Sequence, residues 1–223
     1  AVRSLHDEGF AIWITGSSSK LLSKEIATSL RGRTLSYSLL PFSFREFLKI
    51  KKVSFNLKAL SSPEKSKLGN LLQEYLTYGG FPEIIQEADP QTKLKIIEEY
   101  LNLIIYKDIV ERHKLRNSQL VKWLIKVMIS SFSKELSIHK LYLTLKSQGV
   151  KVSKNTLYAY VSILEDSFFG LLLPKFSYSL RKKELGLTKF YLSDISFFKL
   201  IETTLDYGRI MENVVFLELF RRR

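Results

Sequence analysis

The chain has 223 residues, of which 45% are hydrophobic and 26% charged, so it can bury a sizeable core and is not intrinsically disordered. It has no cysteine, which excludes disulfides, thiolate nucleophiles and zinc fingers, and its three scattered histidines argue against a histidine metal site. No apolar run approaches the roughly 18 residues of a membrane span, and no signal or transit peptide is evident at the start. We therefore expect a cytoplasmic protein without membrane contact.

The net charge of +13 is concentrated in one part of the chain. Residues 1–113 hold 16 basic and 13 acidic side chains, residues 114–191 hold 14 and 4, and residues 192–223 hold 5 and 5. A generally basic composition spreads its excess evenly, whereas a surface that binds a polyanion concentrates it. The basic region, residues 114–191, therefore predicts contact with duplex DNA or another polyanion. A solubilising surface is the alternative interpretation.

The first fifty residues have the pattern of an α/β protein. Residues 10–15 are a continuous apolar run, which predicts a strand buried on both faces of a parallel sheet, with Trp13 in the core. The residues after it predict a helix that ends at Gly32, a second strand over 33–39 and a short helix that begins at Pro41.

The next sixty residues read as helices and a connecting loop. Residues 51–69 are rich in Lys and Ser, which is typical of a surface loop or linker. Helices are expected over residues 71–78, from Pro82 onward and over residues 91–112. No internal repeat is present.

The basic region is expected to begin with three helices. Apolar residues at helical spacing predict a helix over 120–132. Ser137 is a suitable N-cap for a helix over 138–147, and Ser153 for a helix over 154–166.

Two strands with a basic turn between them are expected after these helices. The strands are predicted at residues 170–173 and 190–192, and the turn contains Arg181, Lys182 and Lys183. Helix, helix, turn, helix and a two-stranded wing is the order of a winged helix-turn-helix.

The second helix of this helix-turn-helix carries the candidate nucleic-acid-binding residues. These are Lys154, Asn155, Tyr158 and Ser162, which are expected opposite its apolar stripe and are of types that contact phosphates and base edges. A winged helix is also often a protein-interaction module, so both interpretations stay open at this point.

Three short motifs invite chemical interpretations. Residues 16–20, Gly-Ser-Ser-Ser-Lys, lack the second Gly of a nucleophile elbow and the Gly-Lys-Ser/Thr of a P-loop. They fit either a polar strand end beside a nucleotide or a plain strand-to-helix turn. Arg33 fits an arginine finger or an ordinary surface residue. The pair Asp7 and Glu8 predicts a solvated helix end rather than a metal site.

Several motifs in the same order resemble the archaeal ATPases of the AAA type. Residues 13–19, 30–33 and 40–47 resemble the second half of the ATPase core. Residues 78–83, Tyr-Gly-Gly-Phe-Pro-Glu, are similar to the lid motif of that family. Residues 191–194 and 212–219 resemble the stretch that leads from a winged helix into a nuclease-like C-terminal domain, so the resemblance covers essentially the whole chain.

The resemblance implies a fold class and a domain order. The fold is an α/β fragment, the last strands of a P-loop ATPase sheet, followed by a helical lid and a winged helix-turn-helix, and it is mostly helical overall. The implied domains are the ATPase core over 1–50, the lid over 51–112, the winged helix over 113–192 and the start of a nuclease-like region over 193–223.

The resemblance also implies a function for the complete protein, which would bind ATP and magnesium and hydrolyse ATP to switch the positions of lid and winged helix. The P-loop segment and the magnesium-binding acid of the family are expected before Ala1, and the nuclease motif after Arg223. This chain is therefore expected to hold no cofactor or metal residues and to be inactive alone. Thr15 or Ser17 matches the strand-end sensor, and Arg33 a residue that stabilises phosphate charge.

Two functions of other classes remain open from the sequence. One is a non-enzymatic winged-helix regulator that binds DNA, and the other is a protein-interaction adaptor whose basic face meets an acidic partner. A homo-oligomeric assembly also stays open.

Overall fold

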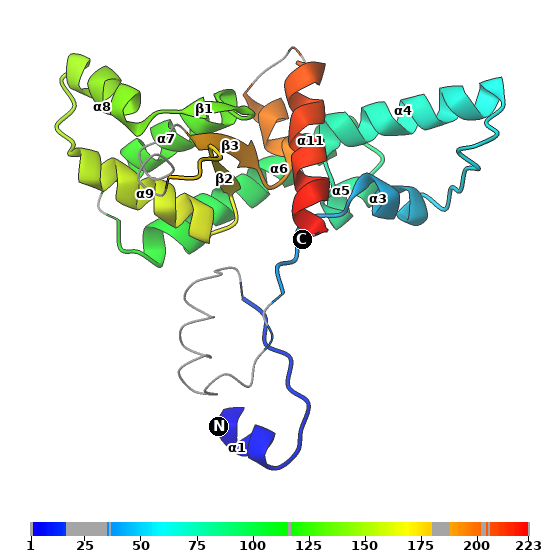
Figure 1. The fold of residues 1–223 in the computed structure, drawn as a ribbon, viewed down its shortest axis with the longest axis horizontal. Coiled ribbons are helices and arrows are strands. Elements are labelled where there is room, and N and C mark those ends of the chain that lie inside the picture. Colours follow the sequence, from blue (N-terminus) through cyan, green and yellow to red (C-terminus); the bar gives the residue numbers. More distant parts are fainter. Residues whose placement is uncertain are drawn as a thin grey trace.

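The computed structural model describes residues 2–16, 35, 37–115, 117–179, 188–201, 204 and 206–222. These residues form a mostly helical body with one small antiparallel sheet (Figure 1). Helix α1 (Val2–Asp7) lies apart from this body, at the bottom of the view.

The segment after α1 is not the buried strand that the sequence predicts. Residues 10–15 are irregular, and Trp13 is 88% exposed. Leu35 and residues 37–39, within the second predicted strand, are also irregular and exposed. A strand buried on both faces needs neighbouring strands for its N–H and C=O groups and helices over its faces. The described part of the chain supplies neither here, so both strand predictions are wrong where they can be compared.

Helix α3 (Phe44–Ile50) begins close to where Pro41 predicted it, because a capping box holds its start. The Glu46 carboxylate accepts a hydrogen bond of 2.8 Å from the backbone N–H of Ser43, and the Ser43 hydroxyl accepts one of 3.4 Å from the N–H of Glu46. Phe47 is buried and packs against the Tyr75 ring with 5.5 Å between centroids.

Helix α4 (Ser62–Tyr78) is longer than expected, and the prediction of a loop over residues 62–69 is wrong. The Glu64 carboxylate accepts hydrogen bonds from the N–H and the hydroxyl of Ser61, at 2.8 and 2.6 Å. Pro63 lies in the first turn, where its missing N–H costs nothing. The Lys- and Ser-rich composition therefore belongs to an exposed helix start.

Helices α5 (Pro82–Gln86) and α6 (Pro90–Leu103) follow, and α6 continues directly into a π-helix, η1 (Ile104–Glu111). Together α6 and η1 correspond to the single helix predicted over 91–112. Ile97 is fully buried on its inner face.

Three helices then follow in the basic region, α7 (Ser118–Ser130), α8 (Ile138–Ser147) and α9 (Lys154–Asp166). The hydroxyls of Ser137 and Ser153 cap α8 and α9 by accepting backbone N–H hydrogen bonds of 3.3 and 3.0 Å. The predicted bounds of α8 and α9 are confirmed.

The sheet has three strands, β1 (Lys134–Leu136), β2 (Gly170–Pro174) and β3 (Thr188–Leu192), in the order β1-β3-β2 with antiparallel pairing. The two strands expected around the basic turn are β2 and β3, whereas β1 has no clear sequence signal. A Cβ at Gly170 would lie 2.3 Å from the Phe190 ring, so this position of β2 needs a glycine.

A short 3₁₀ helix, η2 (Ile195–Leu200), and the long helix α11 (Tyr207–Arg221) complete the body. Helix α11 crosses between the basic region and the α3–α4 pair (Figure 1). One apolar core extends from α3 to α11, and a smaller one of Leu120, Leu145 and Leu157 joins α7, α8 and α9. Within the described ranges, no helix has the length and apolar character to cross a bilayer.

Candidate functional site

The residues predicted for ATP chemistry are not brought together in the described structure. Thr15 is exposed in the irregular segment after α1. Ser17 and Arg33 lie outside the described residues. The roles of all three therefore stay predictions.

The start of α9 presents the predicted nucleic-acid-binding side chains to solvent. Lys154 and Asn155 are exposed, and Tyr158 is 58% exposed, whereas Leu157 in the same turn is fully buried. The Lys154 Nζ lies 5.4 Å from the ring centroid of Tyr142 on α8, so a cation–π contact links the two helices. The three polar side chains form one outward face that can donate hydrogen bonds.

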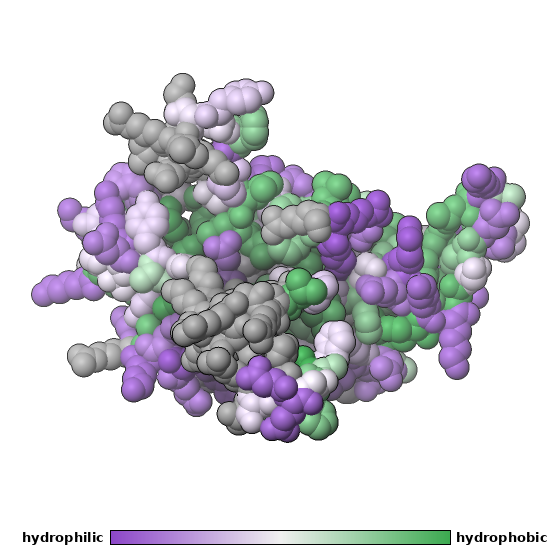
Figure 2. Space-filling view, turned by 60° about the horizontal axis from the view of Figure 1, so that its bottom comes forward, coloured by the Kyte–Doolittle hydropathy of each residue, from purple (hydrophilic) through white to green (hydrophobic). Residues whose placement is uncertain are grey.

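Helix α8 and all of α9 except its last two residues carry no acidic side chain. Residues 136–164 contain no Asp or Glu, and they contain four lysines, Lys140, Lys146, Lys151 and Lys154, all of them exposed. Figure 2 shows hydrophilic side chains projecting from the left-hand end of the molecule, where Figure 1 places these helices. Exposed ammonium groups without neighbouring carboxylates in the sequence suit the phosphates of a nucleic acid.

The hairpin of β2 and β3 borders this surface. Its turn residues Arg181, Lys182 and Lys183 lie outside the described residues. On β3 the Lys189 Nζ is 2.8 Å from a carboxylate oxygen of Glu212, so its charge is already paired within the protein.

A buried carboxylate joins two of the motifs that carry the family resemblance. Asp194 accepts hydrogen bonds from the backbone N–H groups of Gly80, at 2.7 Å, and Ser196, at 2.9 Å. Gly79 has φ +76°, and a Cβ on it would lie 1.8 Å from the Asp194 carboxylate. Burial raises the pKa of Asp194 above its ordinary value, against the opposing effect of these hydrogen bonds. Because Gly79 and Gly80 have no side chains, the backbone can lie against the carboxylate of Asp194.

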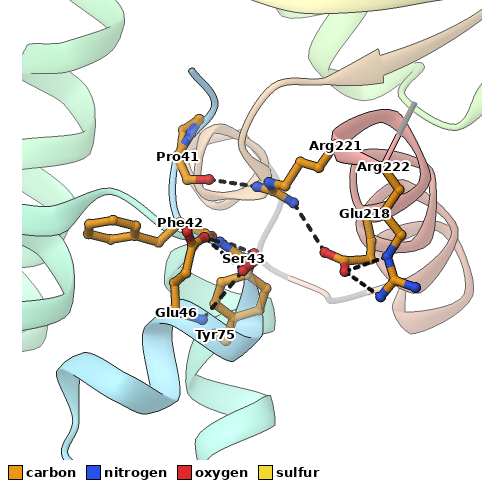
Figure 3. A network of polar contacts seen from close by, with 8 residues as sticks. All are labelled: Pro41, Phe42, Ser43, Glu46, Tyr75, Glu218, Arg221 and Arg222. Carbon is orange, nitrogen blue, oxygen red and sulfur yellow. Dashed lines mark hydrogen bonds and ion pairs between the residues drawn. The ribbon is translucent and has the colours of Figure 1, made fainter. Parts of the chain in front are cut away.

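Hydrogen bonds to Pro41 and Phe42 fix the segment before α3 to the body (Figure 3). Phe42 donates its N–H to the carbonyl of Gly80 at 2.8 Å and accepts the Tyr75 hydroxyl at 2.9 Å. Burial raises the pKa of Tyr75 well above its usual range. From α11, the Arg221 guanidinium donates to the carbonyl of Pro41 at 2.6 Å. Residues far apart in sequence therefore meet at one junction.

A second polar contact links the motif of residues 191–194 to the motif of residues 212–219. Asn213 on α11 is fully buried, and its side chain accepts the N–H of Leu192 at 2.8 Å and donates to the Leu192 carbonyl at 2.9 Å. The Tyr191 hydroxyl donates to Glu212 at 2.8 Å, and burial together with this carboxylate raises the tyrosine pKa.

Sequence reasoning missed the side chains that hold the body together. Asp194 and Asn213 are two of them, and Arg209 is a third. Arg209 donates to the carbonyls of Ser130 and Phe132 at 2.7 and 2.8 Å, at the end of α7, where carbonyls lack partners within the helix. The resemblance pointed to the motifs of Asp194 and Asn213 but not to their contacts. Apart from the N–H of Ser196, the partners in these bonds lie 21 to 114 residues away, so no local spacing signals them.

This architecture is that of a mostly helical protein with a small antiparallel sheet. The chain belongs to a family described as a domain of unknown function (DUF8612), whose model matches residues 69–204. Residues 1–48 match a model described as an AAA domain, which indicates a relation to AAA-type ATPases. No solved structure matches the chain.

Two curated relatives cover nearly all of the chain. It is 46% identical over 222 residues to the protein named Uncharacterized protein MJ1544 of Methanocaldococcus jannaschii, over 99% of this chain and 49% of that protein. It is 31% identical over 215 residues to an uncharacterized protein of Haemophilus influenzae, over 95% of this chain and 51% of that protein. The chain thus spans about half the length of both relatives.

Proposed function

We propose that the chain is the C-terminal portion of an AAA-type switch protein that binds and hydrolyses ATP with magnesium and acts on nucleic acid. The similarity of residues 1–48 to an AAA domain supports the ATPase part. Thr15, exposed in an irregular segment, does not by itself have the surroundings of a nucleotide site. ATP and magnesium therefore belong to the complete protein in this proposal, and no step of hydrolysis is assigned to the described residues.

Residues 113–192 form a winged helix-turn-helix in this proposal. The support is the order α7, β1, α8, α9, β2, β3, with β3 between β1 and β2 in the sheet. Helices α8 and α9 pack against each other through Leu145 and Leu157, and a short turn connects them. In a helix-turn-helix the second helix, here α9, enters the major groove of DNA.

The charge of α8 and α9 is the observation that carries the nucleic-acid part. Four exposed lysines without a carboxylate over residues 136–164 give a surface that attracts phosphates. Lys154, Asn155 and Tyr158 at the exposed start of α9 can then contact phosphates and base edges.

A salt titration of duplex binding tests this function. Fluorescence anisotropy with a labelled blunt duplex, repeated at several salt concentrations, should give a slope of about −0.9 per neutralised phosphate in a plot of log K against log salt. Changing Arg181, Lys182 and Lys183 together to Ala should flatten the slope by roughly two to three units, and Lys154→Ala by roughly one.

The matched control removes the same charge from another surface. Lys49, Lys65 and Lys67 are exposed on α3 and α4, and changing all three to Ala should leave the slope unchanged. Absent or salt-insensitive binding by the unmodified chain would contradict the nucleic-acid function and favour the adaptor. Strong duplex binding by a complete protein that never hydrolyses ATP would favour the non-enzymatic regulator.

A further inference from the structure

Two aromatic side chains stand exposed directly after β2. Phe176 is 78% and Tyr178 98% exposed, and their rings meet edge to face with centroids 5.1 Å apart. In the other ring pairs among the described residues, at least one ring is buried or half-buried. Large exposed apolar groups that adjoin one another commonly mark a binding surface. We call these two residues the aromatic pair.

Strand β2 ends just before the aromatic pair, and a local turn lies between its two residues. Strand β2 pairs with β3 as far as Pro174, which lies opposite Thr188. Ser177, between the two aromatic residues, accepts the N–H of Ser179 on its hydroxyl at 3.2 Å, which forms a local turn. The pair therefore projects from the end of a strand ladder.

The same strand packs against the proposed DNA-binding helix. The N–H of Leu172 on β2 donates to the carboxylate of Glu165 on α9 at 3.2 Å. Strand β2, which ends just before the aromatic pair, thus contacts the helix that carries Lys154.

The basic residues next to the aromatic pair in the sequence favour one kind of partner. Residues 167–183 of the sequence include four basic residues and no acidic one, and Lys175 immediately before the pair is exposed. An apolar protein partner would have to desolvate these cations, which is costly. A nucleic acid strand offers both a π face for each ring and a phosphate for each ammonium group.

We propose that Phe176 and Tyr178 stack on unpaired bases next to the duplex that α9 contacts. The preferred substrate is then a duplex with a single-stranded extension. This inference rests on the proposed function. Bases inside a duplex hide their faces in the stack, so exposed rings can reach a base face only where the strand is unpaired.

The test compares two DNA substrates that differ only in the extension. Anisotropy titrations use a blunt duplex and the same duplex with a single-stranded thymidine extension. The 223-residue chain should bind the extended duplex about tenfold more tightly, which corresponds to one stacked base. The double variant Phe176→Leu/Tyr178→Leu keeps apolar side chains without π faces, so it should lose the preference and retain blunt-duplex affinity.

Two further variants and a spectroscopic signal complete the test. The double variant Phe176→Tyr/Tyr178→Phe should keep the preference, and Tyr37→Leu, at an exposed aromatic residue outside the basic region, should not alter it. With 2-aminopurine at the first unpaired position, binding should quench the base fluorescence, and the leucine variant should not.

The outcomes separate the two proposals. If the chain binds the blunt duplex but shows no preference for the extension, or if the leucine variant keeps the preference, the stacking proposal is overturned and the proposed function stands. If neither DNA binds, the proposed function fails, and the stacking proposal fails with it.

Discussion

The carboxylate of Asp194 accepts a hydrogen bond of 2.7 Å from the backbone N–H of Gly80, which lies 114 residues earlier in the chain. Asp194 is buried, so fixed protein donors must replace the water that it loses on folding. The end of α4 and the start of η2 therefore depend on each other, and they can be tested from either side.

Replacing Gly80 by Ala should destabilise the protein by about 3 kcal/mol, the upper end for inserting one carbon into a packed site. Its Cβ would lie 2.1 Å from the carbonyl oxygen of Phe42, which a hydrogen bond from the Tyr75 hydroxyl holds in place. Urea denaturation followed by circular dichroism measures the change. Gly69→Ala is the control, because Gly69 is an exposed residue of α4 and no atom lies within 4 Å of the new Cβ. It should stabilise by up to about 1 kcal/mol. Equal effects of the two substitutions would contradict this account.

The free energy of unfolding should carry a pH dependence from Asp194. Burial raises the pKa of Asp194 in the native state, so the folded protein binds this proton more readily than the unfolded chain does. The contribution of Asp194 to stability is then greatest below its ordinary pKa of about 4 and falls as pH rises through the native value. The stability of the natural chain minus that of Asp194→Asn should therefore decrease from pH 4 to pH 7, by at most about 1.4 kcal/mol per pH unit. Urea titrations of both proteins at each pH measure the difference, and a constant or growing difference would refute the assignment.

Removing the charge of Glu74 should cost more than removing that of Lys51. Glu74 lies 2.7 Å from the Lys93 Nζ and 2.9 Å from the Lys51 Nζ, and the Lys93 side chain is only 6% exposed. Glu74→Gln leaves the Lys93 ammonium buried without its counter-charge, which should destabilise the protein by about 2 kcal/mol. This loss is smaller than for a fully buried pair, because Glu74 is a quarter exposed. Lys51→Ala should cost less than about 1 kcal/mol. Thermal or urea unfolding of both variants compares them, and a larger loss for Lys51→Ala would reverse the argument.

The 223-residue chain should show no ATP turnover above background, because it contains no Gly-x-x-x-x-Gly-Lys-Ser/Thr sequence to cradle the phosphates.

In the complete protein, which the proposed function takes to carry a P-loop, Arg33→Ala should slow hydrolysis without abolishing ATP binding. Arg45→Ala, on exposed α3, is the control. Phosphate release and nucleotide-binding titrations give the two readouts. An Arg33→Ala protein with the full rate would make Arg33 an ordinary surface residue, and turnover that copurifies with the short chain would contradict the assignment of ATP to the complete protein.

Local capping chemistry made part of this fold predictable. Ser137 and Ser153 each accept an N–H within three residues, so the starts of α8 and α9 depend only on neighbours in sequence. The exposed side chains at the start of α9 followed from the same helical period, because Leu157 marks the buried side. The two strands around the basic turn were also predictable from local sequence, because each is a short apolar run.

Features that depend on distant partners were not predictable. The apolar run over residues 10–15 has a strand pattern, yet a buried strand needs neighbours that the described structure does not provide there. Strand β1 exists because Lys134 to Leu136 pair with β3, over fifty residues later. The burial of Asp194 could not be predicted from the sequence, because its hydrogen-bond donors are backbone N–H groups, which nearly every residue type has. The exposed aromatic pair was equally hidden, because Phe and Tyr are more often core residues.

The hydrogen bond between Arg221 and Pro41 spans 180 residues and has a consequence for synthesis. At roughly 5–20 residues per second, the ribosome makes Pro41 on the order of ten to forty seconds before Arg221. During that interval α3 and α4 can form, but the partner of the Pro41 carbonyl does not yet exist. The growing chain must leave this end of its core open to water and to other molecules until α11 has been made. The α3 end of the core can thus close only after α11 has been made, and chaperones have their best access to it before then.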